Sequence, residues 1–467
     1  MSNNSLKFGT SGLRGLAVEL EGQEARRYVA GFLRHVAGLG QLEGGRLFIG
    51  RDFRASSLAI AQDCAAAAAA AGLVAVDCGT LPTPALALHA MAAGCPCIMV
   101  TGSHIPADRN GLKFYLPGGE IGKADEAGIV SSLRDEAIPA LAVTMVDASE
   151  AATERYFTRC AALLPRGAFA GLRVGVFEHS TVVRDLLVRV IEHYGAEVVR
   201  LDRRDDFIAV DTEAFGDAVF SPLPGWVKQH RLDALVSADG DGDRPLVMDN
   251  QGAFVRGDVL GLLAARYLAA DTVVTPVTSN SAIERTGFFD TVVRTKVGSP
   301  FVVAAMQAAS GAVVGFEANG GTFVGDRVSV DGRPLASLAT RDAILPVLCA
   351  LGLAVRTGRS LNELVASLPL QHALADRLQD VPSDKSAAFL DRLANDENYA
   401  KRVFAPHGIA GLSKIDGLQF RTTSGDMVHF RASGNAPELR CYVEGRTAEI
   451  ASQLLAWGMA VAGKETA

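Results

Sequence analysis

The sequence of 467 residues has no excess of basic residues, no long apolar run and no orderly set of paired cysteines. Its 45 lysines and arginines stand against 52 aspartates and glutamates, which gives a formal net charge of −7. A protein that neutralises a nucleic-acid backbone needs a basic face, so this balance argues against a nucleic-acid partner. It remains compatible with a local basic pocket.

The cysteines and the apolar stretches exclude further classes of protein. Seven cysteines are scattered along the chain, and their odd number is typical of reduced cysteine. The pair Cys95 and Cys97 lacks the C-x-x-C spacing of a redox or zinc site. The start, MSNNSLKFG, lacks the pattern of a secretion signal, and the longest apolar stretch, CAAAAAAAGLVAV, is too short to span a bilayer. We therefore expect a cytoplasmic protein with no membrane partner.

The length exceeds what one ordinary core needs and fits three or four domains. Three segments, which start near residues 46, 172 and 272, each run from a short strand through a polar loop into an amphipathic helix and another strand. Such units predict sheets covered by helices. The last hundred residues instead predict three strands joined by tight turns and a closing helix, which form a smaller α+β domain with antiparallel pairing.

The stretch SADGDGDRPLV places three aspartates, Asp239, Asp241 and Asp243, directly after a strand. Alternation with glycine in an extended loop turns all three carboxylates the same way. Like charges repel unless a cation lies between them, and hard oxygen ligands fit Mg²⁺. No glutamate stands at the twelfth loop position, so the loop is not an EF-hand. The alternative is a solvated acidic turn.

The stretch VTGSHIPADRNGLKFY follows the short strand CIMV and carries Ser103, His104 and Lys113. A hydrolase elbow would need glycine where Ile105 stands. Neighbouring side chains on an extended loop point apart, so His104 is poorly placed as a triad base. A serine that carries a phosphoryl group beside magnesium is chemically coherent, with Lys113 neutralising charge or moving a proton. The alternative for Ser103 is a turn or helix-cap serine.

The stretch RASGNAPELR lies between two expected strands of the last domain and indicates a phosphate clamp. Its tight turn of Ser433, Gly434 and Asn435 can direct amide hydrogens at an anion. Arg431 and Arg440 supply charge and paired donors. A plain hairpin with exposed arginines is the alternative.

Two glycine-rich loops carry further candidates. GFEANGG presents Glu317 and Asn319, a carboxylate and an amide that suit neighbouring sugar hydroxyls, although a surface turn fits equally well. LKFGTSGLRG brackets Arg14 with three glycines. Arg14 is either a partner of a phosphate or phosphoserine or part of a simple turn.

Four of these loops, in this order, resemble those of the α-D-phosphohexomutases, the phosphomannomutase and phosphoglucomutase family. They are TGSHIP for the phosphoserine loop, DGDGDR for the metal loop, GFEANGG for the sugar loop and RASGNAP for the phosphate loop. FGTSGLRG and the turn GRDFRASS also match, so the resemblance spans essentially the whole chain. The sugar loop is more similar to that of a phosphomannomutase subgroup than to that of the phosphoglucosamine mutases.

The resemblance implies an α/β fold of four domains around a central cleft. Three would be mixed α/β domains of common topology, and the C-terminal one a TATA-box-binding-protein-like α+β domain. We expect the boundaries at 1–150 with the phosphoserine loop, 151–253 with the metal loop, 254–368 with the sugar loop and 369–467 with the phosphate loop.

The resemblance also implies roles for particular residues. Ser103 would carry a phosphoryl group and hold Mg²⁺ together with Asp239, Asp241 and Asp243. Arg244 would lie beside the phosphoserine, and Lys113 is our first choice for proton transfer, with His104 and Arg14 also in the catalytic set. The sugar's 3- and 4-hydroxyls would meet Glu317 and Asn319. The non-reacting phosphate would meet Arg431, Ser433, Gly434, Asn435 and Arg440.

The implied activity interconverts mannose 6-phosphate and mannose 1-phosphate through a phosphoserine enzyme. A hexose 1,6-bisphosphate would be both intermediate and activator, and hexose phosphates would be the partners of a monomer or weak homodimer. The alternatives are a phosphoglucomutase, a dual-specificity phosphohexomutase, a phosphoglucosamine mutase, a non-catalytic sugar-phosphate sensor and a magnesium-dependent phosphatase.

The chain departs from the family pattern at several positions. Gly321 and Ser299 stand where many members carry histidine, and Asn435 and Ala436 stand where Thr-Glu is usual. The loop FEHSTVVRD replaces a glycine-rich sequence. These changes leave the metal and serine loops intact and bear on the choice of sugar and on the second proton carrier.

Overall fold

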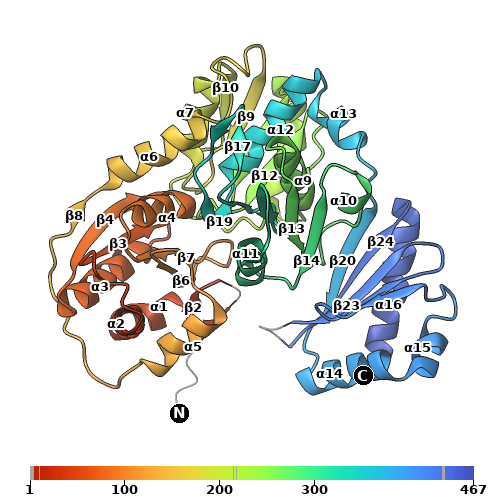
Figure 1. Cartoon of the computed structure of the whole chain (residues 1–467), viewed down its shortest axis with the longest axis horizontal. Coiled ribbons are helices and arrows are strands. Elements are labelled where there is room, and N and C mark those ends of the chain that lie inside the picture. The colour runs from red at the N-terminus through yellow and green to blue at the C-terminus, as the bar shows by residue number, and fades with distance from the viewer. Residues whose placement is uncertain (1–4, 10, 214, 217, 434–436, 467) are drawn as a thin grey trace. The chain divides into compact units, whose positions relative to one another are not determined.

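The computed structural model describes residues 5–9, 11–213, 215–216, 218–433 and 437–466 (Figure 1). Gly434 and Asn435, two of the expected phosphate ligands, lie outside the described residues, as does Ala436. The chain divides into two compact units. Unit 1 consists of 1–274 and 298–365, and unit 2 of 275–297 and 366–467.

The first sheet of unit 1 has the strand order β1-β2-β6-β5-β3-β4-β8, with β7 paired to β6. These strands are β1 (Lys7–Phe8), β2 (Leu13–Leu16), β3 (Arg46–Arg51), β4 (Val74–Thr80), β5 (Cys97–Val100), β6 (Arg109–Leu116), β7 (Gly119–Glu120) and β8 (Val146–Asp147). Strand β3 runs parallel to β4 and β5, whereas β6 runs antiparallel to β5. The loop that carries Ser103 therefore joins two neighbouring strands of this sheet.

Helices cover both faces of this sheet. Successive side chains of β3 point to opposite faces, so each face carries apolar side chains that a helix buries. Leu47 and Ile49 share a core with α2 (Gln23–Gly38), α3 (Ser57–Ala70) and α5 (Lys123–Ser131). Phe48 packs edge-on against His89 of α4 (Thr83–Ala92), which contacts α6 (Ser149–Ala161). The short helix α1 (Ala17–Leu20) precedes α2. The alanine run forms α3, and its small side chains pack closely on the sheet.

The second sheet has the order β10-β9-β11-β12. Its strands are β9 (Arg173–Phe177), β10 (Glu197–Leu201), β11 (Ala234–Ala238) and β12 (Pro245–Asp249), with helices α7 (Arg184–His193) and α8 (Leu223–His230) and the turn η1 (Ala218–Phe220). Strand β11 is parallel to β9 and antiparallel to β12. The three aspartates lie in the tight turn that joins β11 to β12.

The third sheet contributes the strand order β13-β15-β16-β19. The elements are β13 (Thr272–Pro276), β15 (Val313–Phe316), β16 (Thr322–Val324) and β19 (Leu338–Asp342), the hairpin β17 (Ser329–Val330) and β18 (Arg333–Pro334), and helices α9 (Gly257–Tyr267), α11 (Ser299–Ala308), α12 (Ile344–Thr357) and α13 (Leu361–Ala366). Strands β15 and β16 are antiparallel neighbours, and the loop with Glu317 joins them.

Unit 2 contains an antiparallel sheet of order β20-β24-β23-β22-β21. Its elements are α10 (Ala282–Arg285), β14 (Thr291–Thr295), β20 (His372–Leu378), α14 (Ser383–Asn395), α15 (Glu397–Val403), β21 (Gly411–Ser413), β22 (Leu418–Arg421), β23 (Met427–Ala432), β24 (Leu439–Gly445) and α16 (Ala448–Thr466). The expected three strands and closing helix are β22, β23, β24 and α16. The sequence analysis did not anticipate β20 and β21.

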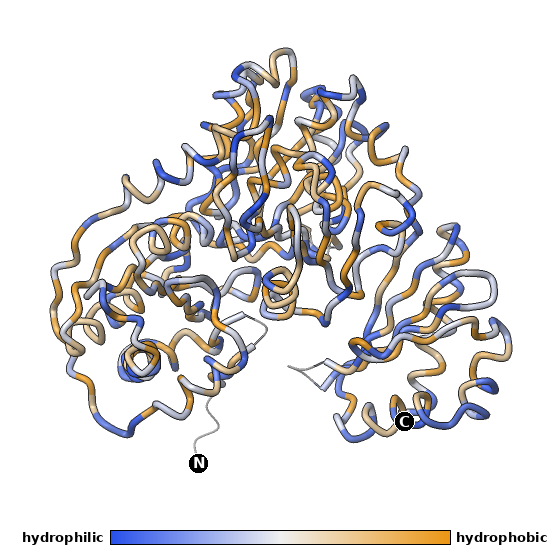
Figure 2. Tube along the Cα trace, in the orientation of Figure 1, coloured by the Kyte–Doolittle hydropathy of each residue, from blue (hydrophilic) through white to orange (hydrophobic). Residues whose placement is uncertain are grey.

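Burial follows the apolar pattern of the chain. Figure 2 shows the tube mainly apolar along the strands and more polar along the outer turns. All seven cysteines are buried and unpaired. Among the described helices, none combines the length and the apolar character needed to cross a membrane. The fold is thus a mixed α/β fold of several sheets, as expected.

Candidate active site

The serine loop is shaped around a buried arginine. Arg54, in the turn after β3, donates hydrogen bonds to the carbonyl oxygens of Ser103, Ile105, Pro106 and Arg109. The guanidinium also stacks on the ring of Phe207 at 4.0 Å and pairs with Asp52 at 3.2 Å. A Cβ at Gly102 would lie 2.7 Å from Arg54 Cζ, so glycine is required there. Arg54 therefore holds the loop in place through hydrogen bonds to the backbone carbonyls of the loop.

Ser103 is the centre of this loop. It is 1 % exposed and has a φ of 53°, a left-handed conformation that non-glycine residues rarely adopt and that occurs at functional sites. Its Oγ donates to Asp239 Oδ2 at 2.5 Å and lies 3.2 Å from His104 Nδ1. The expectation that Ser103 and His104 point apart is wrong, because the left-handed residue folds the two side chains together.

His104 remains unsuited to carrying a positive charge here. Burial, and then the charges of Arg244 and Arg14, lower the pKa of His104 well below its usual value. The imidazole is therefore neutral at neutral pH, and it can donate or accept a hydrogen bond at the Ser103 hydroxyl.

The three aspartates converge as the sequence predicts. Asp239, Asp241 and Asp243 are fully buried, and one carboxylate oxygen from each lies within 4.8 Å of the others. The loop is a tight turn rather than an extended strand. Gly242 has a φ of 71°, and a Cβ at Gly240 would lie 2.8 Å from the carbonyl oxygen of Ser103. The glycines thus allow the aspartate turn to approach the serine loop closely.

The aspartate cluster fits a divalent cation. Asp241 Oδ1 and Asp243 Oδ1 are buried and have no hydrogen-bond partner among the described residues. Burial, and then the charges of Asp241 and Asp243, raise the pKa of Asp239 to about 8. Carboxylate oxygens that lack a hydrogen-bond partner and lie among other negative charges are suitable ligands for Mg²⁺, which prefers oxygen donors.

Lys113 lies on β6 and is buried against the same carboxylates. Its Nζ is 2.6 Å from Asp241 Oδ2 and 2.5 Å from Asp243 Oδ2. Thr83, at the start of α4, also binds Asp241, because its hydroxyl donates to the carboxylate and its backbone N–H donates to the carbonyl oxygen at 2.9 Å. Thr83 belongs to no motif that the sequence shows.

Arginine side chains add positive charge around the cluster. Arg244 is buried and reaches Glu213 at 3.4 Å. The guanidinium of Arg14, on β2, has no hydrogen-bond or ion-pair partner among the side chains that the structure describes. Burial, and then repulsion by Arg244 and Arg341, lower the pKa of Arg14 to about 10. An arginine without a partner beside other arginines suits a bound anion such as a phosphate.

The sugar loop carries its two expected residues in different roles. Glu317 is buried, and its Oε2 accepts from Arg341 Nη1 at 2.9 Å and from Ser299 Oγ at 3.3 Å. Asn319 Oδ1 accepts from the backbone N–H of Gly321 at 3.0 Å. Glu317 therefore meets the ionic cluster, whereas Asn319 closes its own loop.

Arg341, on β19, is the largest omission of the sequence analysis. It is 2 % exposed, and its Nε and Nη2 donate to Asp243 Oδ2 at 3.0 and 2.7 Å. It follows an apolar strand, LAT, and precedes Asp342, which pairs with Arg159. No motif in the sequence marks Arg341.

The expected phosphate clamp lies in unit 2, at the β23–β24 hairpin. Arg431 and Arg440 are directly opposite each other in the register. Arg431 pairs with Asp416 at 2.7 Å, and Arg440 pairs with Glu438 at 3.0 Å. The backbone N–H of Ser433 donates to the carbonyl oxygen of Glu438 at 2.9 Å. Both arginines therefore already have carboxylate partners within unit 2.

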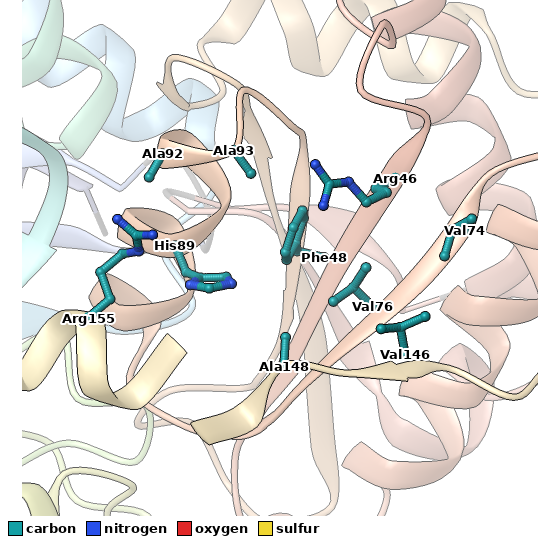
Figure 3. Close-up of a pocket in the computed structure, with 10 residues that line it drawn as sticks. All are labelled: Arg46, Phe48, Val74, Val76, His89, Ala92, Ala93, Val146, Ala148 and Arg155. Atoms are coloured by element: carbon teal, nitrogen blue, oxygen red, sulfur yellow. The ribbon is translucent and has the colours of Figure 1, made fainter. Parts of the chain in front are cut away.

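A hollow of about 310 Å³ lies apart from these residues, between β3, β4 and α4 (Figure 3). Phe48 and His89 lie at its centre, flanked by Arg46 and Arg155. Among the described residues that line it, none carries a carboxylate, a hydroxyl or a thiol. We therefore place the reactive chemistry of unit 1 at Ser103 and the aspartates.

Known proteins share both the sequence and the fold. Residues 5–138 match domain I, and residues 256–371 match domain III, of the phosphoglucomutase/phosphomannomutase alpha/beta/alpha domains. A phosphomannomutase of Sinorhizobium fredii is 46% identical over 97% of this chain and 98% of its own length. A phosphomannomutase of Salmonella muenchen is 40% identical over 97% and 95% of the two chains.

A solved structure extends the likeness to three dimensions. The phosphoglucomutase/phosphomannomutase family protein of Burkholderia thailandensis is 21% identical, covers 98% of this chain and 97% of its own, and superimposes with a TM-score of 0.79. The chain therefore belongs to the phosphoglucomutase/phosphomannomutase family of isomerases, and within it to the phosphomannomutase subgroup.

Proposed function

We propose that this phosphohexomutase interconverts mannose 6-phosphate and mannose 1-phosphate, with Ser103 as the phosphoryl carrier. The observation that carries the proposal is the hydroxyl of Ser103, 2.5 Å from Asp239 at the edge of three buried carboxylates. Relatives named phosphomannomutases, 40% and 46% identical, support mannose as the sugar. Glucose phosphates remain the alternative substrates.

The chemistry begins with a phosphoryl group on Ser103 Oγ. The free hydroxyl of the hexose 6-phosphate attacks the phosphorus, the bond from phosphorus to Ser103 Oγ breaks, and a hexose 1,6-bisphosphate forms. Its other phosphoryl group then returns to Ser103, which leaves the isomeric monophosphate. The same bisphosphate, added from outside, would phosphorylate Ser103 and act as the activator.

The surrounding residues divide the remaining work. Asp239, Asp241 and Asp243 would hold Mg²⁺, which when bound neutralises charge on the transferring phosphoryl group. Arg14 and Arg244 bind phosphate oxygens, because their guanidinium groups are permanent paired donors. Lys113, buried against two aspartates, is the group that we propose transfers the proton of the attacking hydroxyl and returns it in the reverse direction.

We propose substrate-binding residues in each unit, taken separately. Glu317 and Asn319 would bind the sugar's 3- and 4-hydroxyls, and Arg431, Ser433 and Arg440 the non-reacting phosphate. Gly434 and Asn435 complete that proposed loop. We further propose the four domain boundaries expected from the sequence, and a cytoplasmic location, which the seven unpaired cysteines support.

The test is a comparison of wild type with Ser103→Ala and a matched control, Ser131→Ala, whose exposed serine lies on α5. We expect mass spectrometry of the purified protein to find one phosphoryl group, lost in Ser103→Ala and kept in Ser131→Ala. Turnover of mannose 1-phosphate should disappear with it. Unchanged turnover in Ser103→Ala would contradict the carrier role.

Substrate choice is tested by rates with mannose 1-phosphate, glucose 1-phosphate and glucosamine 1-phosphate. Equal or faster turnover of glucosamine 1-phosphate would contradict the choice of mannose. Binding of all three without turnover would favour a sensor, and release of inorganic phosphate faster than isomerisation would favour a phosphatase.

A further inference from the structure

Arg341 connects two loops that come from different sheets of unit 1. Its Nε and Nη2 bind Oδ2 of Asp243 in the aspartate turn, and its Nη1 binds Oε2 of Glu317 in the sugar loop. The guanidinium is 2 % exposed, so water does not screen these contacts. A planar fork with donors on two sides can bind both carboxylates at once, which a lysine ammonium at one point cannot do in the same geometry.

Gly321 makes room for this arginine. A Cβ at position 321 would lie 2.5 Å from Cδ of Arg341, 2.7 Å from Cγ and 2.8 Å from Cβ. Gly321 does not have a positive φ, so the requirement is space and not backbone conformation. The stem of Arg341 therefore occupies the volume that a side chain at 321 would need, and the two residues form a complementary pair.

The contacts of Asp243 divide between its two oxygens. Oδ2 accepts from Arg341 and Lys113, whereas Oδ1 is buried without a hydrogen-bond partner among the described residues. Arg341, together with Lys113, thus binds Oδ2 and leaves Oδ1 of Asp243 available to a cation. It also adds a fixed positive charge that opposes the charge of that cation.

We propose that Arg341 is a positioning residue that ties the aspartate turn to the sugar loop and orients Glu317 for the substrate, with Gly321 as its necessary partner. The proposal rests on the proposed function for the role of Glu317. It assigns Arg341 no proton transfer, because a guanidinium stays charged. The charge of Arg341 affects cation binding, and its simultaneous contacts with Asp243 and Glu317 affect substrate binding. Different substitutions test these two effects.

The first experiment measures Mn²⁺ binding to the unphosphorylated protein by electron paramagnetic resonance, with no sugar present. Arg341→Met removes the opposing charge, so we expect Mn²⁺ to bind about threefold tighter or more. Arg341→Lys keeps the charge, so its affinity should stay near wild type. The control Arg359→Met removes an exposed arginine after α12 and should change nothing.

The second experiment measures KM and kcat for the hexose phosphate. Arg341→Lys cannot bind Asp243 and Glu317 at the same time, so Glu317 loses its orientation toward the substrate. We expect KM to rise roughly tenfold, which corresponds to the loss of one charged hydrogen bond to the substrate. Gly321→Ala pushes the arginine stem aside and should raise KM in the same way. Gly38→Ala, in open space at the end of α2, is its control.

The outcomes separate this proposal from a purely structural role and from failure of the proposed function. Wild-type KM in both Arg341→Lys and Gly321→Ala would overturn the proposal, as would weaker Mn²⁺ binding in Arg341→Met. If Arg341→Met does not fold, Arg341→Gln, which also removes the charge and keeps a polar side chain, replaces it in the Mn²⁺ experiment. If Ser103→Ala retains turnover, the proposed function fails, while the Mn²⁺ measurements still decide the effect of the Arg341 charge.

Discussion

At the scale of single residues, the site contains buried cations that pair with buried carboxylates or with backbone carbonyls. Arg54, Lys113 and Arg341 each meet carboxylates or carbonyls in the interior. Burying an ion is costly unless it is paired and hydrogen-bonded, so these residues are sensitive to loss of either partner. Two substitutions test whether a buried cation supports the fold or the chemistry.

Arg54→Met should destabilise the protein through the serine loop. It removes the guanidinium donor from four loop carbonyls and the ion-pair partner from Asp52, so we expect the free energy of unfolding to fall by about 4 kcal/mol. Urea unfolding measures the change. Arg51→Met, which removes a partly exposed pair with Asp77, is the control and should cost about 1 kcal/mol or less. Equal losses in the two variants would contradict the anchoring role of Arg54.

Lys113→Met should affect the reaction more than binding. Loss of a positioned proton-transfer group lowers kcat by about 100-fold or more, and phosphorylation of Ser103 should still be detectable by mass spectrometry. Lys123→Met, a change of an exposed lysine in α5, is the matched control. A rise in KM with unchanged kcat would assign Lys113 to binding alone.

At the scale of elements, the sequence predicts the loops that carry the site better than it predicts the residues from other elements that contact those loops. The positions of Ser103 and the aspartates follow from short motifs after apolar strands, because such strands end at a common sheet edge. The tight geometry of Gly240 and Gly242 does not follow, since alternation alone suggested an extended loop. Arg341 and Thr83 were missed because they reach the site from β19 and α4, 98 and 158 residues away in the chain from the aspartates that they bind.

The aspartate turn should bind Mg²⁺, and this binding should raise the free energy of unfolding of the protein. A ligand that binds only the folded state stabilises it by about 2.7 kcal/mol at a hundred times its Kd. We expect Mg²⁺ to raise the melting temperature of wild type in a concentration-dependent manner, and chelation to reverse the rise. Asp241→Asn should show a smaller rise, and sodium chloride at equal ionic strength should show none. An identical rise in Asp241→Asn would place the binding elsewhere.

At the scale of the whole molecule, each of the two units buries a neutral histidine. Burial lowers the pKa of His429 in unit 2, where its ring contacts the carbonyl oxygen of Asp416. Burial also lowers the pKa of His179 in unit 1 to about 4, despite the hydrogen bond from its ring to the carbonyl oxygen of Ala238. The loop FEHSTVVRD, which departs from the family pattern, thus places an acid-sensitive group beside the strand that leads into the aspartates.

The shift at His179 predicts how stability depends on pH. Between about pH 4 and 6.5, His179 is protonated in the unfolded chain and neutral in the folded chain. The free energy of unfolding therefore rises with pH across this window. Stability is full above pH 6.5 and declines as the pH falls toward 4, by about 3 kcal/mol from this residue alone. Urea unfolding at several pH values should show that His179→Gln loses less stability on acidification than wild type, whereas the exposed control His372→Gln follows wild type. If His179→Gln shows the same acid sensitivity as wild type, the loss comes from other groups, and the buried neutral state of His179 does not set it.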